Sequence, residues 1–334
     1  MRKLGVGVIG LGVGEQHADG YARLEECEVV ALCDQSEEKL SVVESRYAGV
    51  RATTDWQQLV ADEQVQIVSI ASCDNDHAEQ AVAALDAGKN VFVEKPMCRS
   101  MKELCGIQDA LVRQSHLHLA SNLVLRAAPV YGWLRDSIRC GDLGEIYAID
   151  GDYLYGRIHK ITDGWRKDVD NYSVMQGGGV HLVDLMLWLT GERPIAVTAQ
   201  GNGICTRGTA FNNSDFVAST FSFGSGMIGR ITANFGCVHR HQHVLRVFGT
   251  KATFLLDDCG PRIHRSRNAD SGAEPVDFAV LPSAKWDLIP PFVQEISSGN
   301  RREQTSQHEF DLMSVCLAAD RSLVEKDTVE IVYL

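Results

Sequence analysis

The sequence predicts an α/β protein with two domains, the first built on a parallel sheet and the second on an antiparallel or mixed sheet. Its 334 residues suit about two domains of ordinary size. In the first third, short apolar runs alternate with helical patterns, which is typical of parallel strands covered by helices on both faces. After about Ser121, strand patterns are joined by short glycine turns, which indicates hairpins.

The composition disfavours several classes of protein. A net charge of −12, from 32 basic and 44 acidic side chains, opposes binding to nucleic acid or to an anionic membrane. No apolar stretch reaches the roughly 20 residues that span a bilayer, and the start of the chain lacks the three regions of a signal peptide. The ten cysteines include no Cys-x-x-Cys pair, so we expect reduced thiols and a cytoplasmic protein.

Five apolar runs predict the strands of the first domain, which we place at residues 1–122. A helix is expected between the third and fourth runs, from Asp76 to Gly88, because apolar residues there recur at helical spacing. Asn75 or Asp76 is expected to cap this helix and Gly88 to end it. The five runs are Leu4–Gly10, Val29–Asp34, Val65–Ser72, Val91–Glu94 and Leu117–Ala120.

The second domain is placed at residues 123–334. Sheets of its expected class usually leave one face open to a partner or a substrate. A late helix at about 304–325 is expected to pack back onto the first domain. The expected strands are Glu145–Tyr155, Ile195–Gly201, Phe216–Phe223, Met227–Phe235, Val244–Phe248 and Ala252–Leu256, with turns at Gly224-Ser225-Gly226 and Gly249-Thr250-Lys251.

A glycine-rich loop follows the first strand and predicts a dinucleotide site. Gly10 permits a tight turn, and Gly12 lets the backbone approach a pyrophosphate at a helix N-terminus. The third glycine of the usual pattern is expected where Glu15 stands, whereas Gly14 comes one place early. Asp34 ends the second strand and suits the ribose hydroxyls, which favours NAD over NADP. The alternative is a strand–turn–helix unit without a ligand.

A lysine stands at the end of another strand, in Glu94-Lys95-Pro96. The carboxyl ends of parallel strands form the ligand crevice of such sheets. Lys95 could therefore donate to, or accept from, a substrate oxygen. The alternative is a surface lysine before a proline that ends the strand.

These motifs occur together with others in a pattern that resembles the glucose–fructose oxidoreductase and inositol dehydrogenase family (Gfo/Idh/MocA). The resemblance covers essentially the whole chain. The passages that carry it are the Gly10/Gly12 loop with His17, Cys73–His77, Glu94-Lys95-Pro96, Asn122 through Arg126 to Pro129, Gly141–Gly144, Trp165-Arg166, and the run from Gly177 to Asp184 that contains His181.

The resemblance implies a Rossmann domain followed by an α/β domain with a large, predominantly antiparallel open sheet. It implies a nicotinamide cofactor, a sugar, nucleotide sugar or cyclitol as substrate, and a dimer or tetramer formed through the open sheet. Lys95 is then the catalytic lysine and His181 its partner acid/base. The expected cofactor site comprises Gly10, Gly12, Val13, Gly14, Asp34, Asn75, His77, Glu94, Lys95 and Asn122. The expected substrate site comprises Lys95, Arg126, Trp165, Arg166, Tyr172, His181 and Asp184.

The segment around His181 predicts a helix from Gly179 to Thr190 that Gly191 ends. His181 would lie in its first turn, where the positive helix end disfavours an imidazolium. A neutral imidazole could then take a hydroxyl proton. The glycines before it would let substrate approach the backbone. The alternative is a core histidine that Asp184, one turn on, satisfies.

Two features restrict this interpretation. Many relatives carry an aspartate four residues before the histidine, where this chain has Gly177, which weakens any transfer of inositol specificity. The period-2 run of Cys237, His239, His241 and His243 resembles metal ligands, but we expect no metal and interpret the run as sheet-face or interface packing.

The sequence therefore predicts an NAD-dependent oxidoreductase that transfers hydride between the nicotinamide and a ring carbon bearing a hydroxyl or keto group. Two alternatives stay open. One is a glycosidase that uses NAD for a transient internal oxidation, and the other is a non-catalytic NAD-binding protein. The substrate, the carbon oxidised and the physiological direction are not predicted.

Overall fold

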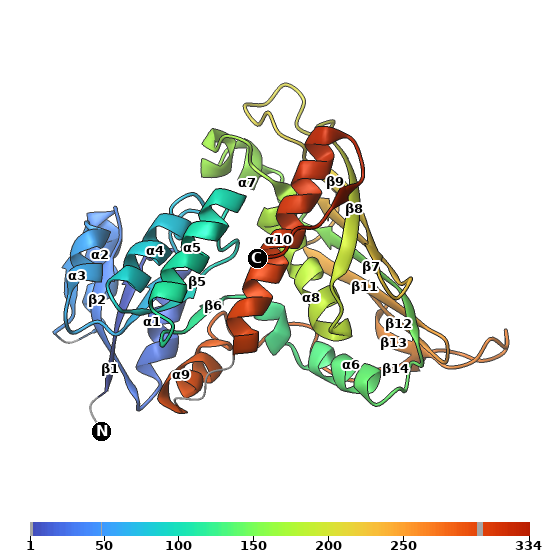
Figure 1. Cartoon of the computed structure of the whole chain (residues 1–334), viewed down its shortest axis with the longest axis horizontal. Helices are drawn as coiled ribbons and strands as arrows, with labels where there is room; N and C mark the ends of the chain where they lie inside the picture. The colour runs from blue at the N-terminus through green and yellow to red at the C-terminus, as the bar shows by residue number, and fades with distance from the viewer. Residues whose placement is uncertain (1–2, 48, 299–302) are drawn as a thin grey trace. The chain divides into compact units, whose positions relative to one another are not determined.

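The computed structural model describes residues 3–47, 49–298 and 303–334, and these form two compact units. The first unit takes in the described residues up to Val124, then Ser283–Met313 and Leu334. The second unit takes in Leu125–Pro282 and Ser314–Tyr333. Each unit has its own sheet (Figure 1).

Within the described residues of the first unit, six parallel strands form one sheet in the order β3-β2-β1-β4-β5-β6. All residues of β4 and β5 are buried, which explains why their sequences are mostly apolar. The five expected strands are confirmed, with ends that differ by at most two residues. The short edge strand β3 was not expected, because its residues are polar or exposed. The strands are β1 (Leu4–Ile9), β2 (Cys27–Cys33), β3 (Arg51–Thr53), β4 (Ile67–Ile70), β5 (Asn90–Val93) and β6 (Leu119–Ser121).

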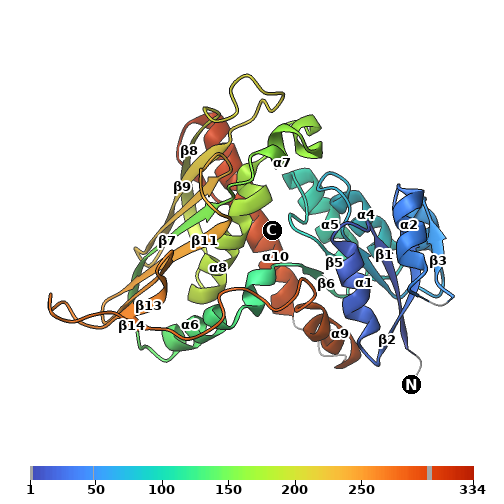
Figure 2. The same cartoon turned by 180° about the vertical axis from the view of Figure 1, so that it is seen from behind.

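Helices cover both faces of this sheet, with α4 and α5 on one face and α1 and α9 on the other (Figures 1 and 2). The rings of Phe92 on β5 and Phe292 on α9 lie 5.4 Å apart in the core, so a segment late in the sequence completes this unit. The helices of the unit are α1 (Gly14–Ala22), α2 (Glu37–Glu44), α3 (Trp56–Ala61), α4 (His77–Asp86), α5 (Met101–Arg113) and α9 (Ile289–Ser298).

The ends of α4 confirm one expectation and correct another. Gly88 follows the helix and has a left-handed backbone conformation, with φ of +76°. This conformation is typical of a glycine that ends a helix, which confirms the predicted end. Asp76 occupies the N-cap position, but its side chain makes no capping hydrogen bond. Its carboxylate instead accepts a 2.8 Å hydrogen bond from the Asn75 side chain, so the expected cap is wrong.

In the described part of the second unit, nine strands form a sheet in the order β14-β13-β12-β11-β7-β10-β9-β8-β15. Neighbouring strands are antiparallel except for the central parallel pair of β7 and β10, which confirms a predominantly antiparallel sheet. The expected hairpins are present. The strands are β7 (Ile146–Leu154), β8 (Pro194–Asn202), β9 (Phe216–Phe223), β10 (Ile228–Asn234), β11 (Gln242–Gly249), β12 (Thr253–Asp257), β13 (Gly260–His264), β14 (Glu274–Pro275) and β15 (Val329–Glu330).

One face of this sheet is covered by α8, which is apolar on all sides and almost fully buried. Gly191 ends α8 with φ of +71°, as predicted. Along β7 and β10, buried residues alternate with more exposed ones, and the opposite face carries no helix among the residues described (Figures 1 and 2). The remaining helical segments are η1 (Val124–Ala127), α6 (Pro129–Arg139), α7 (His159–Thr162), η2 (Trp165–Asp168), the π-helical turn η3 (Met175–Gly179), α8 (Val180–Thr190) and α10 (Glu303–Glu325).

Candidate active site

The loop between β1 and α1 turns sharply at Gly10. Its φ of +85° is one that side chains other than glycine rarely adopt. A Cβ atom at Gly10 would also lie 2.5 Å from the carbonyl oxygen of Ala71, which follows β4. Gly10 is therefore required by the protein's own backbone.

The other two glycines of the loop have different surroundings. A Cβ atom at Gly12 would meet no described protein atom within 4 Å. At Gly14, the first residue of α1, it would lie 3.0 Å from Val8 and 3.2 Å from Ala71, so Gly14 takes the helix-packing role of the third glycine one place early. Val13 stands at the N-cap and has no side-chain oxygen to cap α1. The open space at Gly12 and the uncapped helix end fit a dinucleotide pyrophosphate.

Asp34 follows β2 and connects that strand to the glycine loop. Its carboxylate accepts hydrogen bonds from the backbone N–H groups of Leu11, at 2.7 Å, and Ser36, at 2.9 Å. The Lys39 ammonium lies 3.8 Å away. The carboxylate is thus held beside the loop, at the place where an adenosine ribose is bound in folds of this kind.

A polar network joins the ends of three neighbouring strands. Nε2 of His17 lies 3.2 Å from the Glu94 carboxylate, and Nδ1 of the same ring lies 3.0 Å from the Ser69 hydroxyl. The Asn122 amide donates to Glu94 at 2.7 Å and to the Lys285 carbonyl at 3.0 Å. Burial would raise the pKa of Glu94, but His17, Lys95 and Asn122 outweigh it and lower that pKa to about 2. A carboxylate is therefore fixed beside Lys95.

The turn that carries Lys95 is held by His77. The bond between Lys95 and Pro96 is cis. Nδ1 of His77 lies 2.7 Å from the Pro96 carbonyl oxygen, and its Nε2 lies 3.3 Å from that of Ser72. His77 is buried and Asn75 is exposed. All the residues expected in the cofactor site follow the carboxyl ends of β1, β2, β4, β5 or β6, along one edge of the sheet.

In the second unit, three residues expected in the substrate site lie together. The Arg166 guanidinium stands 4.4 Å over the Trp165 ring, and its Nε donates to the Tyr172 hydroxyl at 2.9 Å. The rings of Trp165 and Tyr172 are 6.4 Å apart. The side chains of Arg166, Tyr172 and Trp165 thus form one group that combines hydrogen-bonding atoms with aromatic surface. Such a combination suits the binding of a ring that carries hydroxyl groups.

The glycine run before α8 corrects two expectations. A Cβ atom at Gly177 would overlap the Tyr172 hydroxyl, and one at Gly178 would overlap the Tyr153 ring. The space beside these glycines is therefore filled by the protein's own aromatic rings. The expectation that substrate approaches the backbone here is wrong. The predicted helix is confirmed as α8, with a start that differs by one residue, but an unexpected π-helical turn, η3 (Met175–Gly179), leads directly into it. His181 is then not at a helix end, and the dipole argument for a neutral imidazole no longer applies.

Arg126 and Asp184 form a buried ion pair. Nε of Arg126 lies 3.0 Å from both carboxylate oxygens of Asp184, and its NH2 group lies 2.5 Å from Oδ1. Asp184 is fully buried on α8. The pair fixes η1, which carries Arg126, to α8, which carries His181.

Another buried carboxylate supports the segment before α8. Asp320 on α10 accepts hydrogen bonds of 2.7 Å from Ser173 and from Gln176. Burial raises the pKa of Asp320 to about 6, although these two hydrogen bonds work against the shift. The tertiary structure thus holds the residues that directly follow Tyr172.

The sequence analysis missed part of the surroundings of His181. The ring of Tyr153 on β7 stacks with that of His181 at 6.2 Å, and His241 and His243 lie against Tyr153. The period-2 spacing correctly predicted that His241 and His243 share a face, but His239 of the same run pairs with Asp258 instead. Sequence alone could not show that this face meets α8, because β7 and β11 are far apart along the chain.

No set of three or more histidine, cysteine, aspartate or glutamate side chains is arranged to hold a metal ion among the described residues. The described helices also include none that is long and apolar enough to cross a membrane.

The parallel sheet, the glycine loop and Asp34 define an NAD-binding Rossmann unit of an oxidoreductase. The sequence profile of the Gfo/Idh/MocA oxidoreductases with an NAD-binding Rossmann fold matches residues 4–121, and the profile of the C-terminal domain of the same family matches residues 131–255. The chain belongs to the Gfo/Idh/MocA family. It is an NAD(P)-dependent oxidoreductase that acts on CH–OH groups, which confirms the predicted family, enzyme class and cofactor.

Characterised proteins with similar sequences are dehydrogenases. The chain is 24% identical to levoglucosan dehydrogenase of Pseudarthrobacter phenanthrenivorans, over 77% of this chain and 74% of that protein. It is 23% identical to myo-inositol 2-dehydrogenase of Thermotoga maritima, over 98% of each. A solved levoglucosan dehydrogenase in complex with NADH has the same fold, with a TM-score of 0.87 and 21% identity over the full length of both chains.

Proposed function

We propose that this protein oxidises or reduces one ring carbon of a sugar, nucleotide sugar or cyclitol, with Lys95 and His181 as its catalytic residues. The observation that carries this proposal is the position of Lys95. It follows β5 at the same sheet edge as the Gly12 loop and Asp34, directly beside the ionised Glu94. Relatives named as levoglucosan and myo-inositol 2-dehydrogenases support the class of substrate.

In the proposed reaction Lys95 donates a hydrogen bond to the substrate oxygen, and His181 takes the hydroxyl proton during oxidation. The nicotinamide, when bound, accepts the hydride that leaves the same carbon. Glu94 and Asn122 fix the turn around Lys95 through their mutual 2.7 Å hydrogen bond. Loss of the proton from oxygen then accompanies loss of hydride from carbon.

We assign recognition of the ring to Trp165, Arg166 and Tyr172, which form one group. Arg126 and Asp184 bind each other closely. Their proposed contribution is to hold α8, and with it His181, against the substrate.

We further propose a cytoplasmic dimer or tetramer that associates through the open face of the nine-stranded sheet. This face is crossed by the ion pairs Arg230–Asp150, at 2.6 Å, and Arg246–Asp152, at 2.9 Å. Ile228 on the same face is 53% exposed. Paired charges beside exposed apolar side chains suit a subunit interface. A monomer by light scattering at working concentration would contradict this association.

The catalytic assignment is tested by NADH absorbance with NAD and a panel of free sugars, inositols and nucleotide sugars. Lys95→Met should lower kcat/KM by about a thousandfold for the substrate found, because it removes the donor to the reacting oxygen. NADH binding, followed by fluorescence, should change little. Lys102→Met, at an exposed lysine on α5, is the matched control and should behave as wild type.

Undiminished turnover in Lys95→Met would contradict the role of the lysine. Cleavage of a glycoside without net formation of NADH would instead identify the internal-redox glycosidase and overturn the proposed net oxidation.

A further inference from the structure

Within the second unit, His243 on β11 lies beside His181, and His241, which directly precedes β11, lies beside His243. The ring centroids of His181 and His243 are 5.7 Å apart, and those of His243 and His241 are 4.9 Å apart. The ring of Tyr153 contacts all three, at 5.2 Å from His241 and from His243 and at 6.2 Å from His181. We call His181, His241 and His243 the histidine cluster.

The strand pairing explains this arrangement. In the antiparallel pair of β11 and β7, His243 lies directly opposite Tyr153, so their side chains are on the same face of the sheet. His241, two residues earlier, points to that face as well. Tyr153 is buried against α8, which carries His181. Residues far apart in the sequence thereby meet at one place.

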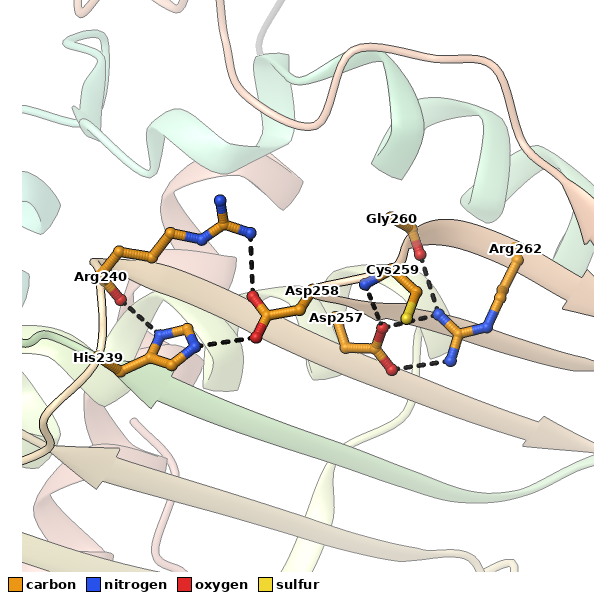
Figure 3. Close-up of polar contacts among 7 residues, drawn as sticks. All are labelled: His239, Arg240, Asp257, Asp258, Cys259, Gly260 and Arg262. Carbon is orange, nitrogen blue, oxygen red and sulfur yellow. Dashed lines mark hydrogen bonds and ion pairs between the residues drawn. The ribbon is translucent and has the colours of Figure 1, made fainter.

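His239 belongs to the same period-2 run but lies outside this cluster, before β11 begins. Figure 3 shows its ring between Arg240 and Asp258. Its Nε2 lies 3.1 Å from the Asp258 carboxylate, and its Nδ1 lies 2.8 Å from the Arg240 carbonyl oxygen. The hydrogen bond to Asp258 raises the pKa of His239. The histidines of the run thus divide into His239, in a surface ion pair, and His241 and His243, which lie against Tyr153.

The cluster has the chemistry of a proton-sharing site. Nδ1 of His181 and the Nε2 atoms of His241 and His243 are all shielded from solvent. A neutral imidazole has one donor and one acceptor nitrogen, so it can receive a proton at one side and release it at the other. Two imidazolium rings at this spacing repel each other, so the cluster holds one proton more readily than two.

Other ionisable groups lie near the histidine cluster, and their charges and partners are as follows. Burial raises the pKa of Tyr153 above its usual range, and Tyr155 and Tyr172 add to that shift, so Tyr153 is a neutral ring. Arg157 and Arg166 oppose it as nearby positive charges. On the helical side, Asp184 is paired with Arg126, and Asp320 is bonded to Ser173 and Gln176.

We propose that His243 is a positioning residue for His181 and that, with His241, it shares the proton that His181 takes from the substrate hydroxyl. This inference rests on the proposed role of His181. During oxidation the C–H bond is lost as hydride to the nicotinamide, and the O–H bond is lost as a proton to His181. That proton is then distributed over the histidine cluster before it reaches solvent, and the carbinol becomes a carbonyl.

The first test measures, without turnover, whether protonation of His181 depends on His243. It is a histidine-selective NMR titration of the full-length protein. His243→Gln should move the titration midpoint of His181 by about half a pH unit or more, because it removes a neighbouring proton acceptor. His239→Gln is the matched control, from the same histidine run, and should leave that midpoint in place. An unchanged His181 midpoint in folded His243→Gln would overturn the proposal.

The second test compares the pH dependence of kcat with that of KM. His243→Phe keeps an aromatic ring against Tyr153 but cannot carry a proton, so kcat should fall about tenfold or more and its pH profile should shift, with KM little changed. His243→Gln, which keeps hydrogen-bonding groups, should recover part of kcat. A wild-type pH profile in His243→Phe would overturn the relay.

The two tests separate this proposal from the proposed function. If His181→Asn turned over at the wild-type rate, the catalytic role of His181 would fail, and the relay that depends on it would fail as well. If His181→Asn is inactive while both His243 variants match the wild-type midpoint and pH profile, only the inference about His243 fails.

Discussion

Two glycine runs, one in each unit, serve opposite purposes. In the first run, a Cβ atom at Gly12 would meet no described protein atom within 4 Å, which leaves space for a ligand. In the second run, Cβ atoms at Gly177 and Gly178 would overlap the rings of Tyr172 and Tyr153. Similar sequence patterns thus expose backbone in one place and make room for side chains in the other.

The comparison shows that a glycine can leave space for a ligand or make room for another side chain of the protein. No described side chain fills the space beside the Gly12 backbone, so an anion can reach the N–H groups at the start of α1. Gly177 brings the Tyr172 hydroxyl to the backbone four residues before His181. The polar group at this position is therefore a phenol, whose hydroxyl accepts a 2.9 Å hydrogen bond from Arg166.

The largest expected effect is a loss of stability at Gly10 that Gly12, in the same run, should not share. Gly10→Ala should lower the free energy of unfolding by about 3 kcal/mol, because the new Cβ meets Ala71 at an unfavourable positive φ. Gly12→Ala should change stability by less than about 1 kcal/mol and weaken NADH binding by about tenfold or more. Urea unfolding without cofactor and NADH fluorescence measure the two effects.

Equal losses of stability in Gly10→Ala and Gly12→Ala would contradict this division of roles. Unchanged NADH binding in Gly12→Ala would mean that the open space beside α1 is not the pyrophosphate site.

The next effect tests the second run. Gly177→Ala should lower the free energy of unfolding by about 2 kcal/mol, because its Cβ competes with the Tyr172 hydroxyl for the same space. In a Tyr172→Phe background the cost of Gly177→Ala should be smaller, since the overlapping oxygen is gone. A double-mutant cycle from urea unfolding measures this coupling. Additive effects would show that Tyr172 does not constrain residue 177.

The smallest of the three effects concerns Asp34. Asp34→Ala should reduce the preference for NAD over NADP by about tenfold, equivalent to about 1.4 kcal/mol, because it removes the charge that repels a 2′-phosphate. Asp34→Asn is the control, since it removes the charge but keeps an acceptor for the Leu11 N–H group. Cofactor titrations that show an undiminished NAD preference in both variants would exclude Asp34 as its cause.

Most of the first unit could be predicted from its sequence, because its determinants are local. The apolar runs, the glycine loop and the residue that ends each strand all lie within short segments. Parallel strands bring their carboxyl ends to one edge, which predicted that Asp34 and Lys95 lie at the same edge of the sheet. Glu94 and Asn122 were assigned to the cofactor site only through the family resemblance. The early third glycine was harder to interpret, and packing of Gly14 against Val8 accounts for it.

Less of the second unit could be predicted. The sequence indicated the strands, the helix ended by Gly191 and the grouping of Trp165, Arg166 and Tyr172. It gave the start of α8 to within one residue but missed the π-helical turn η3 before it, because that turn has no strong sequence signal. It also left the β11 histidines as sheet packing, since nothing local shows which element lies over that face.

The sequence by itself determined the fold class, the cofactor and the identity of the lysine and histidine expected to do the chemistry. The fold class and the glycine loop depend on residue type and short spacing, which a linear chain displays directly, whereas the lysine and histidine were paired through the family resemblance. Only the tertiary structure decided which residues surround His181. Tyr153 and His243 become neighbours through the register of β7 and β11, and α8 reaches them by packing across the sheet. Such neighbours are fixed by burial and strand pairing over long sequence separations, which no local pattern contains.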